Sequence, residues 1–80
     1  MSDHTGEKLV RMANQIGTFF SHQGEGPEAE EKAVAAITQH LRDFWDPRMR
    51  RQILEHLAHG GEGLEPLARR AVERLAVEAA

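Results

Sequence analysis

Five histidines are the side chains of this sequence best suited to bind a metal ion or move a proton. His56 and His59 are three residues apart, so a helix would place them on one face. The HExxH pattern is absent, and two histidines alone do not make a zinc site. We therefore predict no metal site. We expect His22 and His59 to bond free carbonyl groups in the last turns of helices.

Groups for covalent or acid–base catalysis are scarce. The sequence has no Cys and no Tyr, which excludes disulfides, thiolate nucleophiles and cysteine-ligated zinc or iron–sulfur sites. The glycine-rich stretch GGEGLEP (residues 60–66) lacks the Lys-Ser/Thr ending of a phosphate-binding loop, and Glu62 would repel an anion. These observations predict a chain without a catalytic site or cofactor of its own.

The segment 42–51 concentrates residue types that dominate protein interfaces. It holds the only Trp, Trp45. Its four Arg and two Asp give it a charge of +2, so the rest of the chain has a charge of −5 and the whole chain a net charge of −3. Arg forms planar bidentate contacts and, with Trp, is enriched at interface hot spots. Composition alone leaves three possibilities open: a protein-binding face, a nucleic-acid-binding face, or a buried Trp45 with solvated Arg side chains.

The elements that would position these residues are all helical. Apolar residues recur at intervals of three and four along the whole chain, which predicts an all-α fold. Four helices are expected: from Gly6 or Glu7 to His22, from Pro27 to Phe44, from Pro47 to the Gly60-Gly61 pair, and from Pro66 to the fraying C-terminus. The predicted core consists of Met12, Ile16, Phe20, Ile37, Leu41, Met49, Ile53 and Leu57.

The Asp46-Pro47 pair divides the chain into two halves, because Asp46 can cap a helix whose first residue is Pro47. The similar sequences HQGEG (His22–Gly26) and HGGEG (His59–Gly63) stop a helix in each half. We interpret them as helix stop signals, with duplication of a hairpin as the alternative. The pattern predicts a small four-helix domain made of two helical hairpins joined at Asp46-Pro47. Residues 1–6 are expected to form a flexible tail, 7–78 the single domain and 79–80 a frayed end.

Size and charge favour a binding or subunit role. An 80-residue chain buries only about 60% of its unfolded surface, which leaves little core from which to form a catalytic cavity. The net charge of −3 disfavours general binding to nucleic acid. No apolar run approaches the length of a membrane span. We expect a soluble, cytoplasmic protein that does not bind membranes.

Three stretches in a fixed order carry a resemblance to a known family. They are KLVRMANQIGTFF (Lys8–Phe20), HLRDFWDPRMRRQIL (His40–Leu54) and GGEGLEPL (Gly60–Leu67). With the helices between them, the chain resembles the delta subunit of NAD-dependent, molybdenum-containing formate dehydrogenases, although Ser21–Glu31 is not matched. The resemblance implies a noncatalytic accessory subunit that binds the large catalytic subunit and supports assembly, stability or activity. Molybdopterin, iron–sulfur clusters, FMN and NAD are then expected in the larger subunits.

Two groups of side chains are predicted to bind that partner. One lies in the first helix and the other follows the second helix: Arg11, Asn14 and Gln15, and Trp45, Arg48, Arg50 and Arg51. The alternative function is a small nucleic-acid-binding domain that uses the third helix, PRMRRQILEHL. An exposed docking surface would also allow the isolated chain to self-associate.

Overall fold

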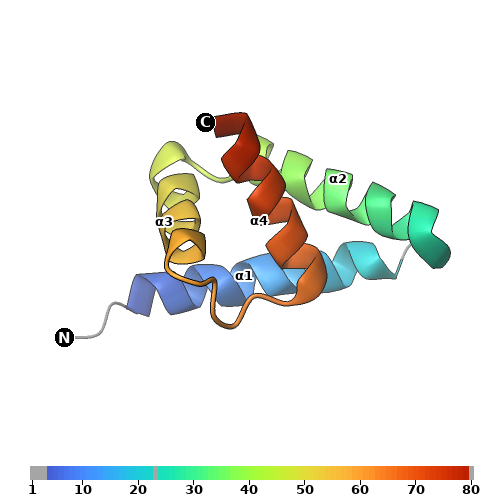
Figure 1. The fold of residues 1–80 in the computed structure, drawn as a ribbon, viewed down its shortest axis with the longest axis horizontal. Coiled ribbons are helices and arrows are strands. Elements are labelled where there is room, and N and C mark those ends of the chain that lie inside the picture. The colour runs from blue at the N-terminus through green and yellow to red at the C-terminus, as the bar shows by residue number, and fades with distance from the viewer. Residues whose placement is uncertain (1–3, 23, 80) are drawn as a thin grey trace.

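The computed structural model describes residues 4–22 and 24–79, and this part of the chain forms four α-helices (Figure 1). The helices are α1 (His4–Ser21), α2 (Gly26–Phe44), α3 (Pro47–Ala58) and α4 (Pro66–Ala79). These ranges contain no strand, so the predicted all-α, four-helix fold is confirmed. No helix among them has both the length and the apolar character needed to cross a membrane.

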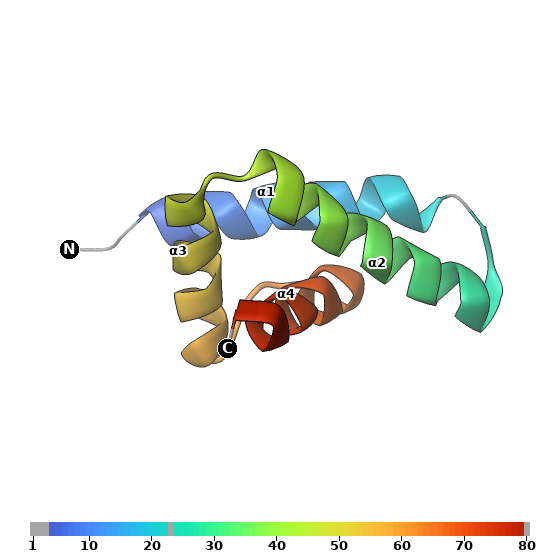
Figure 2. The same ribbon diagram turned by 90° about the horizontal axis from the view of Figure 1, so that it is seen from above.

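The four helices pack around a shared core, and the most extensive packing is between α2 and α4. α1 packs against α2, and α3 packs against α4. α4 also contacts α1, and α1 contacts α3, so the hairpins that are consecutive in sequence are not separate packing units. Figure 2 shows α1 and α2 alongside each other and α3 across the end of the domain where α1 begins. The contacts of α4 with both α1 and α2 cover one side of the α1–α2 pair.

The first helix begins earlier than predicted. It starts at His4, two or three residues before the expected start. The additional turn lies beside α3, where a Cβ placed on Gly6 would be 4.0 Å from Nδ1 of His56. At Gly6, α1 thus already lies close to α3. The rest of the predicted tail, residues 1–3, lies outside the described residues, as does Ala80 of the predicted frayed end.

The corner between α2 and α3 forms as predicted. The Asp46 side chain accepts a hydrogen bond of 2.9 Å from the backbone N–H of Met49, and Pro47 is the first residue of α3. On the other side of the corner, the backbone N–H of Trp45 donates to the Leu41 carbonyl at 3.2 Å. A capped helix start and a satisfied helix end thus meet within two residues, which fixes the chain direction at this point.

The fully buried residues come from all four helices, and the largest of these side chains lie on α2, α3 and α4. Ile37, Leu41 and Ile53 are completely buried, as predicted. Thr38 is the buried polar residue of α2, and its hydroxyl donates to the Val34 carbonyl at 2.8 Å. Because this hydroxyl is bonded to its own helix, its burial carries little penalty.

The other five residues of the predicted core are only partly buried. They pack against the core cluster, but each keeps part of its side chain accessible: Met12, Ile16, Phe20, Met49 and Leu57. Three of them belong to α1. The apolar stripe of α1 is therefore wider than the surface that the other helices cover, and its uncovered edge forms the site described next.

Candidate partner-binding groove

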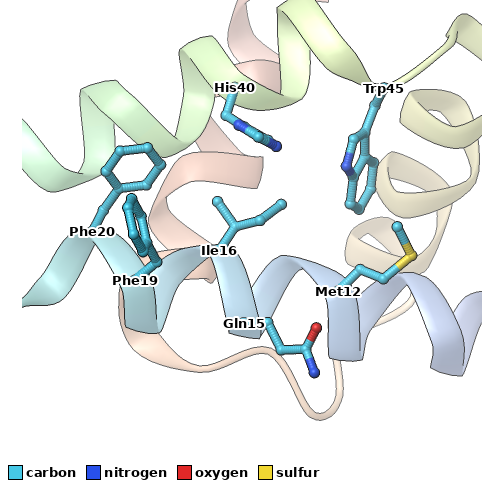
Figure 3. A pocket seen from close by; sticks show the side chains of 7 residues that line it. All are labelled: Met12, Gln15, Ile16, Phe19, Phe20, His40 and Trp45. Carbon is cyan, nitrogen blue, oxygen red and sulfur yellow. The ribbon is translucent and has the colours of Figure 1, made fainter.

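A groove lies between α1 and α2, with α4 behind it in Figure 3. Its volume is about 380 Å³. We call it the aromatic groove because of the rings gathered around it. Its walls are formed by Met12, Gln15, Ile16, Phe19, Phe20, His40 and Trp45.

Helical spacing explains how these residues come to share one groove. The five residues from α1 lie at relative positions i, i+3, i+4, i+7 and i+8, which form one face of a helix. His40 points toward them from α2. Trp45 lies just beyond the end of α2, and Figure 3 shows its ring beside Met12 at one end of the groove, with Phe19 and Phe20 at the other.

Three of the four Phe and Trp residues line this groove, and the fourth, Phe44, contacts its His40 wall. Phe19 and Phe20 meet edge to face with ring centroids 5.1 Å apart. Phe20 and His40 are 6.4 Å apart, and His40 and Phe44 are 4.7 Å apart. Phe44 therefore belongs to the rim of the groove through its contact with His40, and Trp45 closes the end. Aromatic residues are enriched where proteins bind one another.

Two of these rings are largely in water. Phe19 is 64% exposed and Phe44 is 74% exposed. Complete burial of a Phe side chain is favourable by about 1.5–3 kcal/mol. A partner that covers both rings would gain several kcal/mol by this route before the entropy of association is subtracted. Because of these exposed rings, the groove is the apolar surface best suited to be covered by a partner.

The expectation that the corner presents Trp45 outward is wrong, because the side chain is only 4% exposed. The chain turns at the end of α2, and the ring folds back into the domain beside Met12 (Figure 3). Trp45 is therefore part of the core cluster, and the small exposed part of this residue lines the groove.

Arg50 is also used within the chain. Its guanidinium donates a hydrogen bond of 3.0 Å to the Arg42 carbonyl and a second one to the Trp45 carbonyl. These carbonyls belong to the last turn of α2 and to the residue that follows it, where helix geometry leaves such groups without intrahelical partners. Arg50 therefore caps the end of α2 and ties it to α3, instead of pointing freely toward a partner.

Asn14 connects α1 to the loop before α4. Its amide nitrogen donates to the Gly63 carbonyl at 2.9 Å, and its amide oxygen accepts from the backbone N–H of Glu65 at 2.9 Å. Gly63 has a φ of 90°, and a Cβ there would lie 3.3 Å from Cγ1 of Val10. The loop thus approaches α1 closely, and Asn14 holds it there.

The remaining predicted residues are exposed and have no ion pair in the described part of the chain. Arg11 and Gln15 lie one turn apart on α1, and Gln15 lines the groove. Arg48 and Arg51 lie in the first turns of α3. Their role in binding a partner stays a prediction.

A family model for the NADH-dependent formate dehydrogenase delta subunit (FdsD) matches residues 8–72. The chain belongs to this family. The resemblance inferred from the three sequence stretches is thereby confirmed. No curated protein and no solved structure is significantly similar to the chain.

The segment that matches the delta subunit family contains the whole lining of the aromatic groove and all seven residues predicted to bind a partner. It also spans residues 21–31, which the three resembling stretches leave out. The groove is thus built from the part of the chain that the family shares.

Only Gln15 and Trp45 of the groove lining are among the residues predicted to bind a partner, and Met12, Ile16 and Phe20 are predicted as core residues instead. Phe19, His40 and Phe44 lie on or beside the apolar faces of their helices, where the sequence pattern favours a packing role. The available signal is that the four large aromatic residues form two adjacent pairs, Phe19-Phe20 near the end of one helix and Phe44-Trp45 at the end of the next. That signal becomes specific only once α1 and α2 are known to be neighbours.

The histidines of α3 have structural partners. Nδ1 of His59 lies 2.9 Å from the Glu55 carbonyl, and Nε2 of His56 lies 2.7 Å from the Glu62 carbonyl. His59 thus contacts a carbonyl in the last turn of α3, as predicted, but this carbonyl is not free because it also accepts from the backbone N–H of His59 at 3.2 Å. Within residues 4–22 and 24–79, no cluster of three or more His, Cys, Asp or Glu side chains could hold a metal ion.

Proposed function

We propose that this chain is a noncatalytic accessory subunit of an NAD-dependent formate dehydrogenase, which binds the large catalytic subunit and supports the assembly, stability or activity of the complex. Its membership of the delta subunit family makes the other subunits its natural partners. The aromatic groove is the observation that carries the proposal, because a small domain that leaves two Phe rings mostly in water has a surface suited to a partner.

The same proposal assigns the redox chemistry to the larger subunits. Molybdopterin, iron–sulfur clusters, FMN and NAD would be bound there, and this chain would contribute no ligand to them. The sequence supports this division because it has no Cys to hold an iron–sulfur cluster. The absence of Cys also fits a cytoplasmic complex, which we include in the proposal.

A nucleic-acid-binding role for α3 has less support. Of the three Arg residues in its first turns, Arg50 is bonded to backbone carbonyls, which leaves Arg48 and Arg51 for phosphate contacts. Ile53 of the same helix is fully buried. A helix that is anchored on one face and carries two free cations offers few contacts for a phosphate backbone.

Co-expression tests the proposal directly. The chain, tagged at its N-terminus, is produced together with the larger formate dehydrogenase subunits, and the purified material is separated by size-exclusion chromatography. We expect the chain to elute with the large subunits in a fixed ratio. Omitting the chain should lower the yield of assembled complex or its rate of NAD reduction by formate. Elution of the chain apart from an intact and fully active complex would rule the proposal out.

A further inference from the structure

We infer that the aromatic groove receives the apolar face of an amphipathic helix of a larger subunit, and that carboxylates at one end of this helix pair with Arg11 and Arg48. This inference rests on the function proposed above and adds the site and the chemistry of its occupant. It follows from which cations lack partners, where they lie, and what shape the groove has.

Half of the ten Lys and Arg residues already have partners within the chain. Arg50 is bonded to carbonyls, and four others pair with carboxylates: Arg42 with Glu78, Arg69 with Glu73, Arg70 with Glu30 and Glu31, and Arg74 with Glu31. All five of these ion pairs involve a residue of α4. The side of the domain that α4 covers is therefore electrostatically satisfied.

The cations without an ion pair in the described ranges are Lys8, Arg11, Lys32, Arg48 and Arg51. Lys8 and Arg11 lie one turn before Met12 and Gln15 on α1, and Arg48 follows Trp45 by three residues. Met12 and Trp45 form the same end of the groove in Figure 3. Asp43 and Asp46 lie close to this end in sequence, but they accept hydrogen bonds from Gln39 and from the backbone N–H of Met49. In the described ranges the cations of this end are therefore left without an ion pair and can bind carboxylates of a partner.

The opposite end of the groove has a different character. Glu25 and Glu28 share a surface hollow with Phe20 and Lys32, so carboxylates outnumber cations there. A partner that carried acidic residues along its whole length would be repelled at this end. The charge pattern thus fits an occupant whose carboxylates gather at the Met12–Trp45 end, and it sets the direction in which that occupant lies.

The dimensions of the groove fit side chains projecting from a helix. A volume of about 380 Å³ accommodates a few apolar side chains but not a helix backbone. The backbone of the occupant would then lie above the groove, in the channel between α1 and α2, and insert anchors at spacings of three and four residues. Phe19 and Phe44 would cover its flanks, while Gln15 is an exposed amide at the wall that can bond polar groups beside the anchors.

Photo-cross-linking in the assembled complex tests both the site and the occupant. Phe44 is replaced by the photo-cross-linking amino acid p-benzoylphenylalanine, the chain is co-expressed with the larger subunits, and the cross-linked peptides are identified by mass spectrometry. The same replacement at Val77, which is 76% exposed on α4, is the matched control. We expect the position 44 probe to capture a helix of a larger subunit that has one apolar face and Asp or Glu near one end.

Substitutions measure the two contributions separately. Phe44→Ala and Arg48→Glu are each expected to weaken binding of the chain to the larger subunits roughly tenfold or more. Arg48→Glu should also reduce the salt dependence of binding. Arg70→Glu makes the same charge change on α4, and although it also breaks the exposed ion pairs with Glu30 and Glu31, it should have a much smaller effect on binding. Circular dichroism of each isolated variant shows that its fold is retained, as expected for exposed positions.

The outcomes separate this inference from the proposed function. If the wild-type chain does not join the complex, the proposed function fails together with the inference. If the chain joins the complex but Phe44→Ala and Arg48→Glu bind normally, only the inference fails. Cross-links from position 44 to a second copy of the chain, to nucleic acid or to a segment rich in Lys and Arg would likewise overturn the inference.

Discussion

The His40 ring lies 4.7 Å from the Phe44 ring, one turn further along α2, with the two planes inclined by 33°. This contact holds one face of Phe44 against the domain while 74% of the side chain remains in water. The ring is thus oriented at the rim of the groove before any partner arrives. A surface prepared in this way loses less side-chain entropy when it is covered.

The exposed rings predict weak self-association of the isolated chain. At high concentration, two grooves can cover each other's Phe19 and Phe44. Sedimentation velocity of the free chain should show an average mass that rises with concentration. Phe44→Ala should suppress this rise and change the free energy of unfolding by less than about 0.5 kcal/mol. Val77→Ala serves as the control, and an equal effect of both substitutions would contradict the assignment of self-association to the groove.

Asn14 and Gln15 are adjacent amides with different environments, and we predict different effects of their removal. Asn14→Ala deletes both hydrogen bonds to the loop before α4 and should lower the free energy of unfolding by about 1–2 kcal/mol. Gln15→Ala removes an exposed side chain and should change stability by less than about 0.5 kcal/mol. Urea denaturation followed by circular dichroism measures both. Equal losses would show that the loop is not held by Asn14.

Arg50 and Arg51 form a second matched pair. Arg50→Met keeps an apolar stem but removes the donors to the Arg42 and Trp45 carbonyls, so we expect a loss of about 1 kcal/mol. Arg51→Met at an exposed position should be nearly neutral for folding. Thermal unfolding of the two variants side by side provides the comparison. A neutral result for Arg50→Met would argue against its capping of α2.

Trp45 is predicted to be essential for folding. Trp45→Ala would leave a large void between α1 and the corner and should cost about 3–5 kcal/mol, which is a large share of the stability of a domain of this size. Trp45→Phe keeps a ring in the same place and should be milder. Hydrogen exchange of both variants distinguishes global unfolding from local change. A folded Trp45→Ala variant with unchanged stability would contradict the burial of this ring.

Residue types near position 46 were enough to predict the corner between α2 and α3, but not the long-range contacts of Trp45 and Asn14. Asp46 and Pro47 specify a helix start within three residues, so the sequence alone reveals their role. Whether Trp45 points inward depends on α1, which lies more than twenty residues earlier in the chain. The bonds of Asn14 are longer in range still, since they join residues 49 and 51 positions apart.

The partial coverage of α1 was likewise beyond sequence reasoning. Met12, Ile16 and Phe20 have the spacing of a buried stripe, and nothing in their types indicates that a neighbouring helix is missing. A surface awaiting another subunit and a core face carry the same periodic pattern. Only the packing of α4 against one side of the α1–α2 pair reveals which part of the stripe remains open.

Trp45 is the only tryptophan of the chain, and it lies in the wall of the groove. Indole fluorescence depends on the polarity around the ring and on nearby quenching groups. The protein therefore carries an intrinsic optical reporter at the place where a partner helix would insert. A helical peptide without tryptophan, taken from a larger subunit, could be titrated against the unlabelled chain. The shift of the Trp45 emission maximum would then report how much of the groove is occupied.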